Sequence, residues 1–236
     1  MGTKGWIIFA GIAVAVLGSL IFLSNQGKID VSGFDVNNVI AANDKDGNIG
    51  DRTFGKKDSK VVLIEYGDYQ CPGCGSANPR VKALTKKYKD QIVFIFRNLP
   101  LTSMHPNARV AAATAEAAGQ QGKYWEMHNL LYDSQNEWNT ASTRERTGIF
   151  RGYAERLGLD LAKFDSDITS PAINQKISFD QAIFKATGYQ QATPTFVING
   201  ELISQDVWGD DTAFDNLITD KLKAAGIELP EASKAE

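Results

Sequence analysis

The sequence predicts an α/β fold in which two groups of strands are separated by a long helical region. Two apolar runs rich in β-branched residues, 60–66 and 92–96, flank a helical segment, which is the order of parallel strands joined by a crossover helix. A second pair of short strands, 195–198 and 201–204, follows only after about eighty residues with helical patterns. Asn199-Gly200 lies between these two runs and is a strong hairpin signal.

The helices have recognisable starting points. The first opens at Cys71-Pro72-Gly73-Cys74 and runs to about residue 90, and Pro79 inside it is expected to kink it. Ser142 and Glu145 form a capping box that opens a helix to residue 157. Further helices are predicted at 107–118, 123–132, 171–187 and 211–225. Before the first strand, 34–40 is a candidate short outer strand and 42–48 has the composition of a loop.

The amino terminus carries an apolar segment of membrane-spanning length. Residues 6–23 are almost wholly apolar, and 18 residues of helix extend about 27 Å, against about 30 Å for a hydrocarbon core. The charge that precedes them is that of Lys4 and the α-amino group, which favours an amino terminus inside and a body outside. The sequence therefore predicts a single-pass cell-membrane protein whose main domain lies on the extracytoplasmic side and which contacts lipid through residues 6–23.

A cleaved signal peptide is the alternative interpretation of the same segment. The apolar region of a signal peptide usually has about 7–15 residues and ends at an A-x-A-like site. The segment here is longer and has no such site at its end, so an uncleaved anchor is favoured. In either case the body lies where disulfides form and persist.

These observations divide the chain into four parts. Residues 1–28 are the anchor or cleaved signal, and residues 29–58 are a tether and an amino-terminal extension. The main domain covers 59–226, with the helical region at about 103–190. Residues 227–236 form a polar tail.

The composition excludes several classes of protein. Hydrophobic residues make up 43% and charged residues 22% of the 236, values typical of a globular protein. Without Lys4 and Lys28 the chain has 23 basic and 28 acidic residues, a net charge of −5, against −3 for the whole. An acidic body with no basic run argues against a nucleic-acid partner.

Both cysteines of the chain lie in one CxxC motif, Cys71-Pro72-Gly73-Cys74. Two cysteines are too few for a disulfide scaffold or a four-cysteine zinc site. Unpaired N–H groups at a helix amino terminus stabilise a thiolate on Cys71, while Cys74 lies one turn later and is expected to be more buried. Cys71 would then be the attacking and leaving sulfur, and Cys74 would resolve the mixed disulfide.

Stapling and metal binding are the alternative roles for this motif. A disulfide that closes so short a loop removes little chain entropy and is a poor staple. A metal site needs further ligands, and the two histidines, His105 and His128, belong to a different segment. Redox chemistry at a Cys71–Cys74 disulfide, with no cofactor and no metal, is therefore favoured.

Glu65 and Thr193-Pro194 are further candidates for the site. Glu65 ends an apolar strand six residues before Cys71, where it could lie beneath the active site and carry the proton of Cys74, or could point to solvent. Thr193-Pro194 precedes a strand, where a proline can simply cap the strand edge. A cis bond there would lie against the CxxC and leave the backbone of Thr193 free to pair with a substrate. Position alone leaves the two roles of Glu65 equally open and favours the edge role of Pro194.

The combined motifs resemble DsbA-like thioredoxin-fold proteins, in particular their membrane-anchored bacterial forms. The resemblance covers about residues 51–225 and rests on these segments: Glu65-x5-Cys71-Pro72-x-Cys74, Asn98-Leu99-Pro100-Leu101, His105-Pro106-Asn107-Ala108, Lys123-Tyr124-Trp125-Glu126-Met127-His128, and Thr193-Pro194-Thr195-Phe196 with Asn199-Gly200. It implies a thioredoxin fold with an inserted helical domain. It also implies a nucleophilic Cys71, a resolving Cys74, a cis-proline loop at Thr193-Pro194 and a buried acid at Glu65. His105 and His128 would be structural.

Gly73 departs from the family pattern. Strongly oxidising members carry a histidine at this place after Pro72, where a cation helps to stabilise the thiolate. Gly73 offers a backbone N–H and no charge, which favours a less oxidising couple.

The resemblance implies an extracytoplasmic thiol–disulfide oxidoreductase. The leading interpretation is an oxidase that donates the Cys71–Cys74 disulfide to reduced or misoxidised secreted or membrane proteins. A membrane quinone-linked thiol oxidase of the DsbB or VKOR type would reoxidise it, and the protein is expected to be a monomer. A reductase or isomerase on the same fold, a non-catalytic anchored binding module and a metal carrier remain alternatives.

Overall fold

The computed structural model describes residues 2, 6, 11–14, 16–19, 29–42 and 49–230. Its centre is a five-stranded sheet in the order β1-β3-β2-β4-β5, in which β2 and β3 are parallel and the other neighbours are antiparallel. The strands are β1 (Arg52–Gly55), β2 (Val62–Gly67), β3 (Val93–Asn98), β4 (Thr195–Ile198) and β5 (Glu201–Ile203). The predicted α/β fold with helices between two groups of strands is confirmed.

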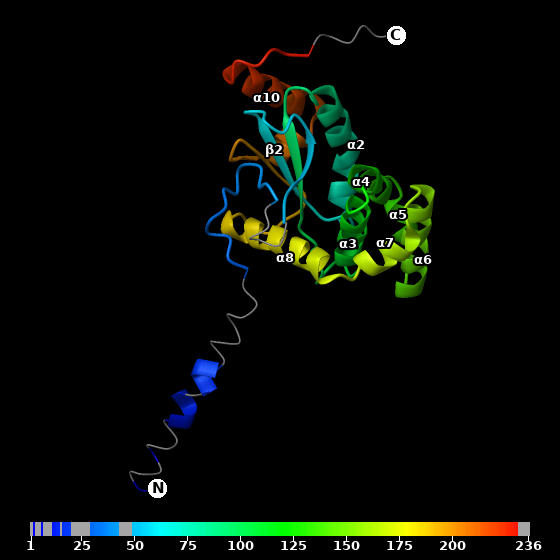
Figure 1. The fold of residues 1–236 in the computed structure, drawn as a ribbon. Helices are drawn as coiled ribbons and strands as arrows, with labels where there is room; N and C mark the ends of the chain where they lie inside the picture. Colours follow the sequence, from blue (N-terminus) through cyan, green and yellow to red (C-terminus); the bar gives the residue numbers. More distant parts are fainter. Residues whose placement is uncertain are drawn as a thin grey trace.

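Helices cover both faces of this sheet and extend to one side of it (Figure 1). The crossover between β2 and β3 is α2, and six helices lie between β3 and β4. In chain order the helices are α2 (Pro72–Lys87), α3 (Ala108–Gly119), α4 (Tyr124–Asp133), α5 (Gln135–Trp138), α6 (Thr143–Arg156), α7 (Leu161–Asp167), α8 (Pro171–Ala186), α9 (Gln205–Trp208) and α10 (Asp211–Ala224).

Side-chain alternation along β2 divides the core into two layers. Leu63 packs with residues of α2, α4 and α10, whereas Val62, Ile64 and Tyr66 pack with α8 on the opposite face. All six residues of β2 are buried, because a central strand covered on both faces reads as a continuous apolar run. Glu65 is the ionisable residue in that run. Because it is two residues from Leu63, its side chain lies on the same face of the sheet as that of Leu63.

Several predicted elements are confirmed nearly to the residue. Ser142 and Glu145 form the reciprocal capping box at the start of α6. Asn199 and Gly200 join β4 to β5 with φ values of 47° and 81°, the left-handed turn that Asn-Gly favours. Pro79 lies inside α2, which continues as one helix to Lys87, and the kink expected at Pro79 stays a prediction.

The outer strand predicted at 34–40 is wrong. Asp30 and Asp35 accept hydrogen bonds from the backbone N–H groups of Ser32 and Asn37, which holds this segment in turns. The edge strand is instead β1, which pairs antiparallel with β3.

The predicted membrane anchor stays a prediction. Residues 7–10, 15 and 20–23 of the 6–23 segment lie outside the described residues, as does the tail beyond residue 230. Within the described residues, no helix is long and apolar enough to cross a membrane.

A buried ion pair ties the amino-terminal extension to the sheet. The Arg97 guanidinium on β3 donates to both carboxylate oxygens of Asp51 at 3.0 and 2.9 Å, and neither side chain is exposed. The same guanidinium also donates to the carbonyl oxygens of Val36 and Asn38 and to the Tyr66 hydroxyl. The Val36 and Asn38 carbonyl groups of this segment thus bind Arg97 instead of a neighbouring strand.

We expect Asp51→Ala to lower the free energy of unfolding by about 3–5 kcal/mol, because it leaves the Arg97 charge buried and unpaired. Urea denaturation of the full chain measures this change. Asp165→Ala is the control, since it breaks the half-exposed pair with Arg151 and should cost no more than about 1 kcal/mol. If Asp51→Ala lowered the free energy of unfolding as little as the control does, the buried Asp51–Arg97 pair would not stabilise the fold as described.

Candidate active site

The CxxC motif opens α2 directly after the central strand. Cys71 has extended backbone angles and is the N-cap residue, and Pro72 is the first residue of the helix. The Cys71 N–H donates to the Asp68 carbonyl at 3.0 Å, and the Gly75 N–H donates to the Cys71 carbonyl at 3.1 Å. A proline fits the first helical position because the N–H that it lacks would have no partner there. This start leaves the N–H groups of the first turn directed at the Cys71 sulfur.

Asp68 holds the loop that precedes the motif. One oxygen of its buried carboxylate accepts from the Gln70 N–H at 2.8 Å. The other accepts from the Leu101 N–H at 2.9 Å and lies 2.7 Å from Nδ1 of His105. On the opposite side, the Gln135 amide donates to the carbonyl oxygens of Tyr69 and Cys71 at 2.7 and 2.9 Å. Sequence reasoning missed Asp68 and Gln135, although Asp68 stands three residues before Cys71.

Cys71 is the accessible sulfur of the pair. Its sulfur is half-buried and lies 3.3 Å from the Thr193 carbonyl oxygen, to which the protonated thiol donates. The pKa of Cys71 is lowered to about 5, chiefly because the thiolate accepts a hydrogen bond from the Cys74 thiol and also because the N–H groups of Cys74 and Gly73 point at it. At neutral pH Cys71 is therefore a thiolate.

Cys74 has the opposite environment. It is completely buried, and burial raises the pKa of its thiol well above the ordinary value. The neighbouring Asp68 N–H lies 3.5 Å from its sulfur. Both cysteines are free thiols in this structure. The structure thus has the expected contrast between a half-buried, more acidic Cys71 and a fully buried, less acidic Cys74.

The Thr193–Pro194 peptide bond is cis and lies against the CxxC motif. Gly73 faces this loop, since a Cβ on residue 73 would lie 3.3 Å from Cδ of Pro194 and 3.6 Å from Sγ of Cys71. The edge role that position alone favoured for Pro194 is therefore wrong. The segments 71–74 and 193–194 form one surface although they are far apart in the sequence.

Glu65 lies beneath the motif and does not point to solvent. It is 2% exposed, and its Oε1 atom has no hydrogen-bond partner among the described residues. Burial, followed by the negative charge of Cys71, raises the pKa of Glu65 to about 8. The carboxyl is thus largely protonated at neutral pH and lies next to the sulfur pair.

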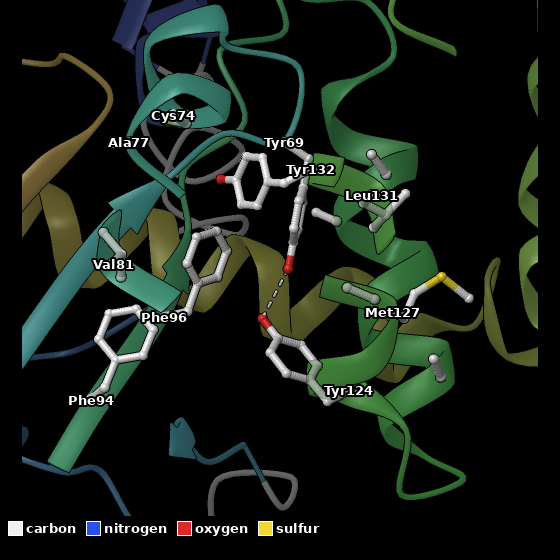
Figure 2. Packing of buried hydrophobic residues seen from close by; sticks show 14 of the residues in the cluster. Tyr69, Cys74, Ala77, Val81, Phe94, Phe96, Tyr124, Met127, Leu131 and Tyr132 are labelled. Atoms are coloured by element: carbon white, nitrogen blue, oxygen red, sulfur yellow. Dashed lines mark hydrogen bonds between the residues drawn. The ribbon is translucent and has the colours of Figure 1, made fainter. Parts of the chain in front are cut away.

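An aromatic cluster closes the site from the side of α4. Tyr69, Phe96 and Tyr132 pack between that helix and the strands, and the Tyr69 hydroxyl donates to that of Tyr124 at 3.3 Å (Figure 2). His128 lies in the same cluster with Nδ1 2.9 Å from the Tyr69 hydroxyl, and burial lowers its pKa to about 3. This placement agrees with a structural role for His128. Within the described ranges, no group of three or more possible metal ligands occurs.

Comparison with known proteins shows the family. Residues 47–219 match the family model described as Thioredoxin. The Na⁺/H⁺ antiporter NhaA 1 of Salinispora arenicola is 41% identical over 152 residues, which are 64% of this chain and 22% of that protein. The chain thus spans less than a quarter of the length of the curated relatives that it matches.

Two solved structures show the fold. BdbD from Bacillus subtilis in its oxidised form has a TM-score of 0.64 and 20% identity, with 79% of this chain and 98% of that chain covered. The α-DsbA1 protein of Wolbachia pipientis has a TM-score of 0.63 and 22% identity, with 74% and 92% covered. The architecture of five strands and inserted helices is therefore that of DsbA-type proteins.

The raised pKa of Glu65 makes stability depend on pH. The folded protein keeps the carboxyl neutral to about pH 8, whereas in the unfolded chain the carboxyl has its ordinary pKa of 4.5. The free energy of unfolding contributed by the neutral carboxyl is fully present below pH 4.5. It declines as the pH rises above 4.5 and is lost as the pH passes through about 8. We expect Glu65→Gln to remove this loss and to raise the free energy of unfolding of the reduced protein by about 3 kcal/mol at pH 7.

Denaturation curves between pH 4 and 9 measure this effect, with the exposed Glu155→Gln as the matched control. Parallel pH profiles for the wild type and Glu65→Gln would show that the buried carboxyl does not have a raised pKa.

Proposed function

The chain belongs to the thioredoxin family and is by fold a DsbA-like thiol–disulfide oxidoreductase, and we propose that it works as an oxidase that donates the Cys71–Cys74 disulfide to protein thiols. The observation that carries this proposal is the contrast within the pair. A half-buried Cys71 whose thiolate is stabilised stands one helical turn from a fully buried Cys74. Stabilising the thiolate favours the reduced form, so the disulfide readily accepts electrons.

The first step begins at Cys71. A substrate thiolate attacks Sγ of Cys71, and the bond between Cys71 and Cys74 breaks. The electron pair goes to Sγ of Cys74, whose burial disfavours a thiolate. Glu65 is protonated at neutral pH and supplies the proton that this sulfur needs. Glu65 thereby acts as a general acid in this direction and as a general base when the dithiol is reoxidised.

The second step releases the product. A second thiolate of the substrate attacks the substrate sulfur that is bonded to Cys71. A disulfide forms within the substrate, and Cys71 leaves as a thiolate. Its low pKa makes Cys71 the better leaving group. The substrate has lost two electrons and two protons in all, and the protein holds a dithiol. In this scheme the cysteine pair is the redox group and no metal or organic cofactor takes part.

The Thr193–Pro194 loop is the proposed contact for the substrate backbone. The Thr193 carbonyl lies 3.3 Å from Sγ of Cys71, so a chain bound to this loop has its sulfur next to the reactive atom. Substrates are proposed to be reduced or misoxidised secreted and membrane proteins, and the protein is proposed to act as a monomer.

The cell membrane is the proposed location, with the catalytic domain on the extracytoplasmic side. The apolar composition of residues 6–23 supports this, as do the exposed apolar side chains on the helical residues 11–14 and 16–19. Tethering would keep the dithiol close to a membrane quinone-linked thiol oxidase of the DsbB or VKOR type, which we propose as its oxidant.

A disulfide reductase is the second candidate, and Gly73 favours it. This position supplies a backbone N–H to the Cys71 thiolate but no positive charge. The couple would then be less oxidising than one with a cation between its cysteines.

Oxidation of a reduced, unfolded protein by the oxidised full chain tests the proposal. We expect stoichiometric transfer of one disulfide, loss of transfer in Cys71→Ser, and trapped mixed disulfides in Cys74→Ala. Ser76→Ala is the control, since it alters a hydroxyl on the same helix and leaves both sulfurs in place. Full transfer by Cys71→Ser would contradict the mechanism.

A further inference from the structure

Three buried oxygen atoms near the sulfur pair lack a hydrogen-bond partner in the described part of the chain: Oε1 of Glu65, the hydroxyl of Tyr132 and Oγ1 of Thr193. Thr193 belongs to the loop that contacts Cys71, whereas the other two oxygens lie together beneath the motif. Buried polar atoms in folded proteins nearly always have a partner, so a pair of such atoms at one site calls for an explanation. Tyr132 has no role in the exchange as described so far.

The oxygens of Glu65 and Tyr132 lie on the same face of β2. Glu65 and Gly67 are two residues apart on this strand, so their side-chain positions point the same way and are about 7 Å apart. Gly67 has no side chain, and the ring of Phe96 and the hydroxyl of Tyr132 fill its place. The Tyr132 hydroxyl lies 3.0 Å from where a Cβ on residue 67 would be. It therefore reaches across from α4 to the position next to Glu65.

Tyr132 differs from the other tyrosines of the cluster. The hydroxyl of Tyr69 is hydrogen-bonded to that of Tyr124 (Figure 2). The Tyr69 hydroxyl also lies 2.9 Å from Nδ1 of His128. These groups satisfy one another. Among the described tyrosines of the cluster, Tyr132 thus has the hydroxyl that remains uncommitted beside the carboxyl.

Among the described residues, no cation faces Glu65 to pair with an ionised carboxylate. On the flanking strands β3 and β4, its neighbours are the apolar Phe96 and Phe196. The titratable groups that face it are acids or neutral donors: Cys71 and Cys74 of α2, Tyr69 of the loop, and Tyr132 of α4. His128 of the same helix is held neutral by burial.

We propose that Tyr132 is a positioning residue of thiol–disulfide exchange, whose hydroxyl donates a hydrogen bond to the Glu65 carboxylate, directly or across one water molecule. This inference rests on the proposed function. When Cys74 leaves the disulfide, it takes the proton of the Glu65 carboxyl. Tyr132 keeps its own proton and stabilises the carboxylate until a proton from solvent restores the acid. Because Tyr132 donates this hydrogen bond only to the ionised Glu65 carboxylate, it stabilises the product of proton transfer to Cys74 and so assists the transfer.

The titration of Glu65 in the full, reduced chain tests this assignment without any substrate. Infrared spectroscopy follows the carbonyl stretch of the protonated carboxyl, identified by its loss in Glu65→Gln. We expect Tyr132→Phe to move the midpoint upward by about one pH unit, the size of one hydrogen bond to a charged group. Tyr124→Phe is the matched control and should leave the midpoint unchanged. An unchanged midpoint in folded Tyr132→Phe would overturn the assignment.

Kinetics provide a second test. We expect Tyr132→Phe to slow the reduction of the oxidised chain by dithiothreitol about tenfold, and to have no further effect in Glu65→Gln. Equal slowing in both backgrounds would show that Tyr132 acts through the fold alone and would overturn the proposal. The two proposals fail separately. If the wild type does not oxidise protein thiols but both effects of Tyr132→Phe appear, the oxidase proposal is wrong and the assignment of Tyr132 stands.

Discussion

The burial of Cys74 beneath the first turn of α2 is the constraint on which the proposed chemistry depends. Helical spacing places this sulfur one turn behind Cys71, so one member of the pair faces solvent and the other faces the core. The same hydrogen bond between the sulfurs favours the thiolate on Cys71 and disfavours it on Cys74. An asymmetric pair follows, in which one sulfur can always leave as an anion and the other needs a proton.

Glu65 is placed to supply the proton that Cys74 needs. Glu65 is held in an apolar layer, where burial keeps its carboxyl protonated at neutral pH. Asp68 instead contacts several hydrogen-bond donors and fixes the loop between β2 and α2. Two carboxyl groups only three residues apart thus have different functions because one is surrounded by hydrogen-bond donors and the other is not.

Local patterns were sufficient for much of the fold. The β-branched run of β2, the capping box at Ser142 and the Asn199-Gly200 turn each specify their structure within a few residues, and all were predicted correctly. The edge strand could not be predicted because β1 is short and polar and exists through its pairing with β3. The segment 34–40 looked like a strand, but its carbonyl groups bind Arg97, a partner about sixty residues away. The sequence could not decide whether Glu65 is buried or points to solvent, because this depends on the helix that packs over it. Tyr132 gave no signal in the sequence because its place beside Gly67 depends on how α4 packs.

The reduction potential of the Cys71–Cys74 couple distinguishes an oxidase from a reductase. It can be measured by equilibrating the full chain with glutathione buffers. The reference values are about −120 mV for DsbA and about −270 mV for thioredoxin. With the pKa of Cys71 at about 5, the account predicts a potential above about −200 mV, closer to that of DsbA. A potential at or below about −250 mV would contradict it and would identify the protein as a reductase.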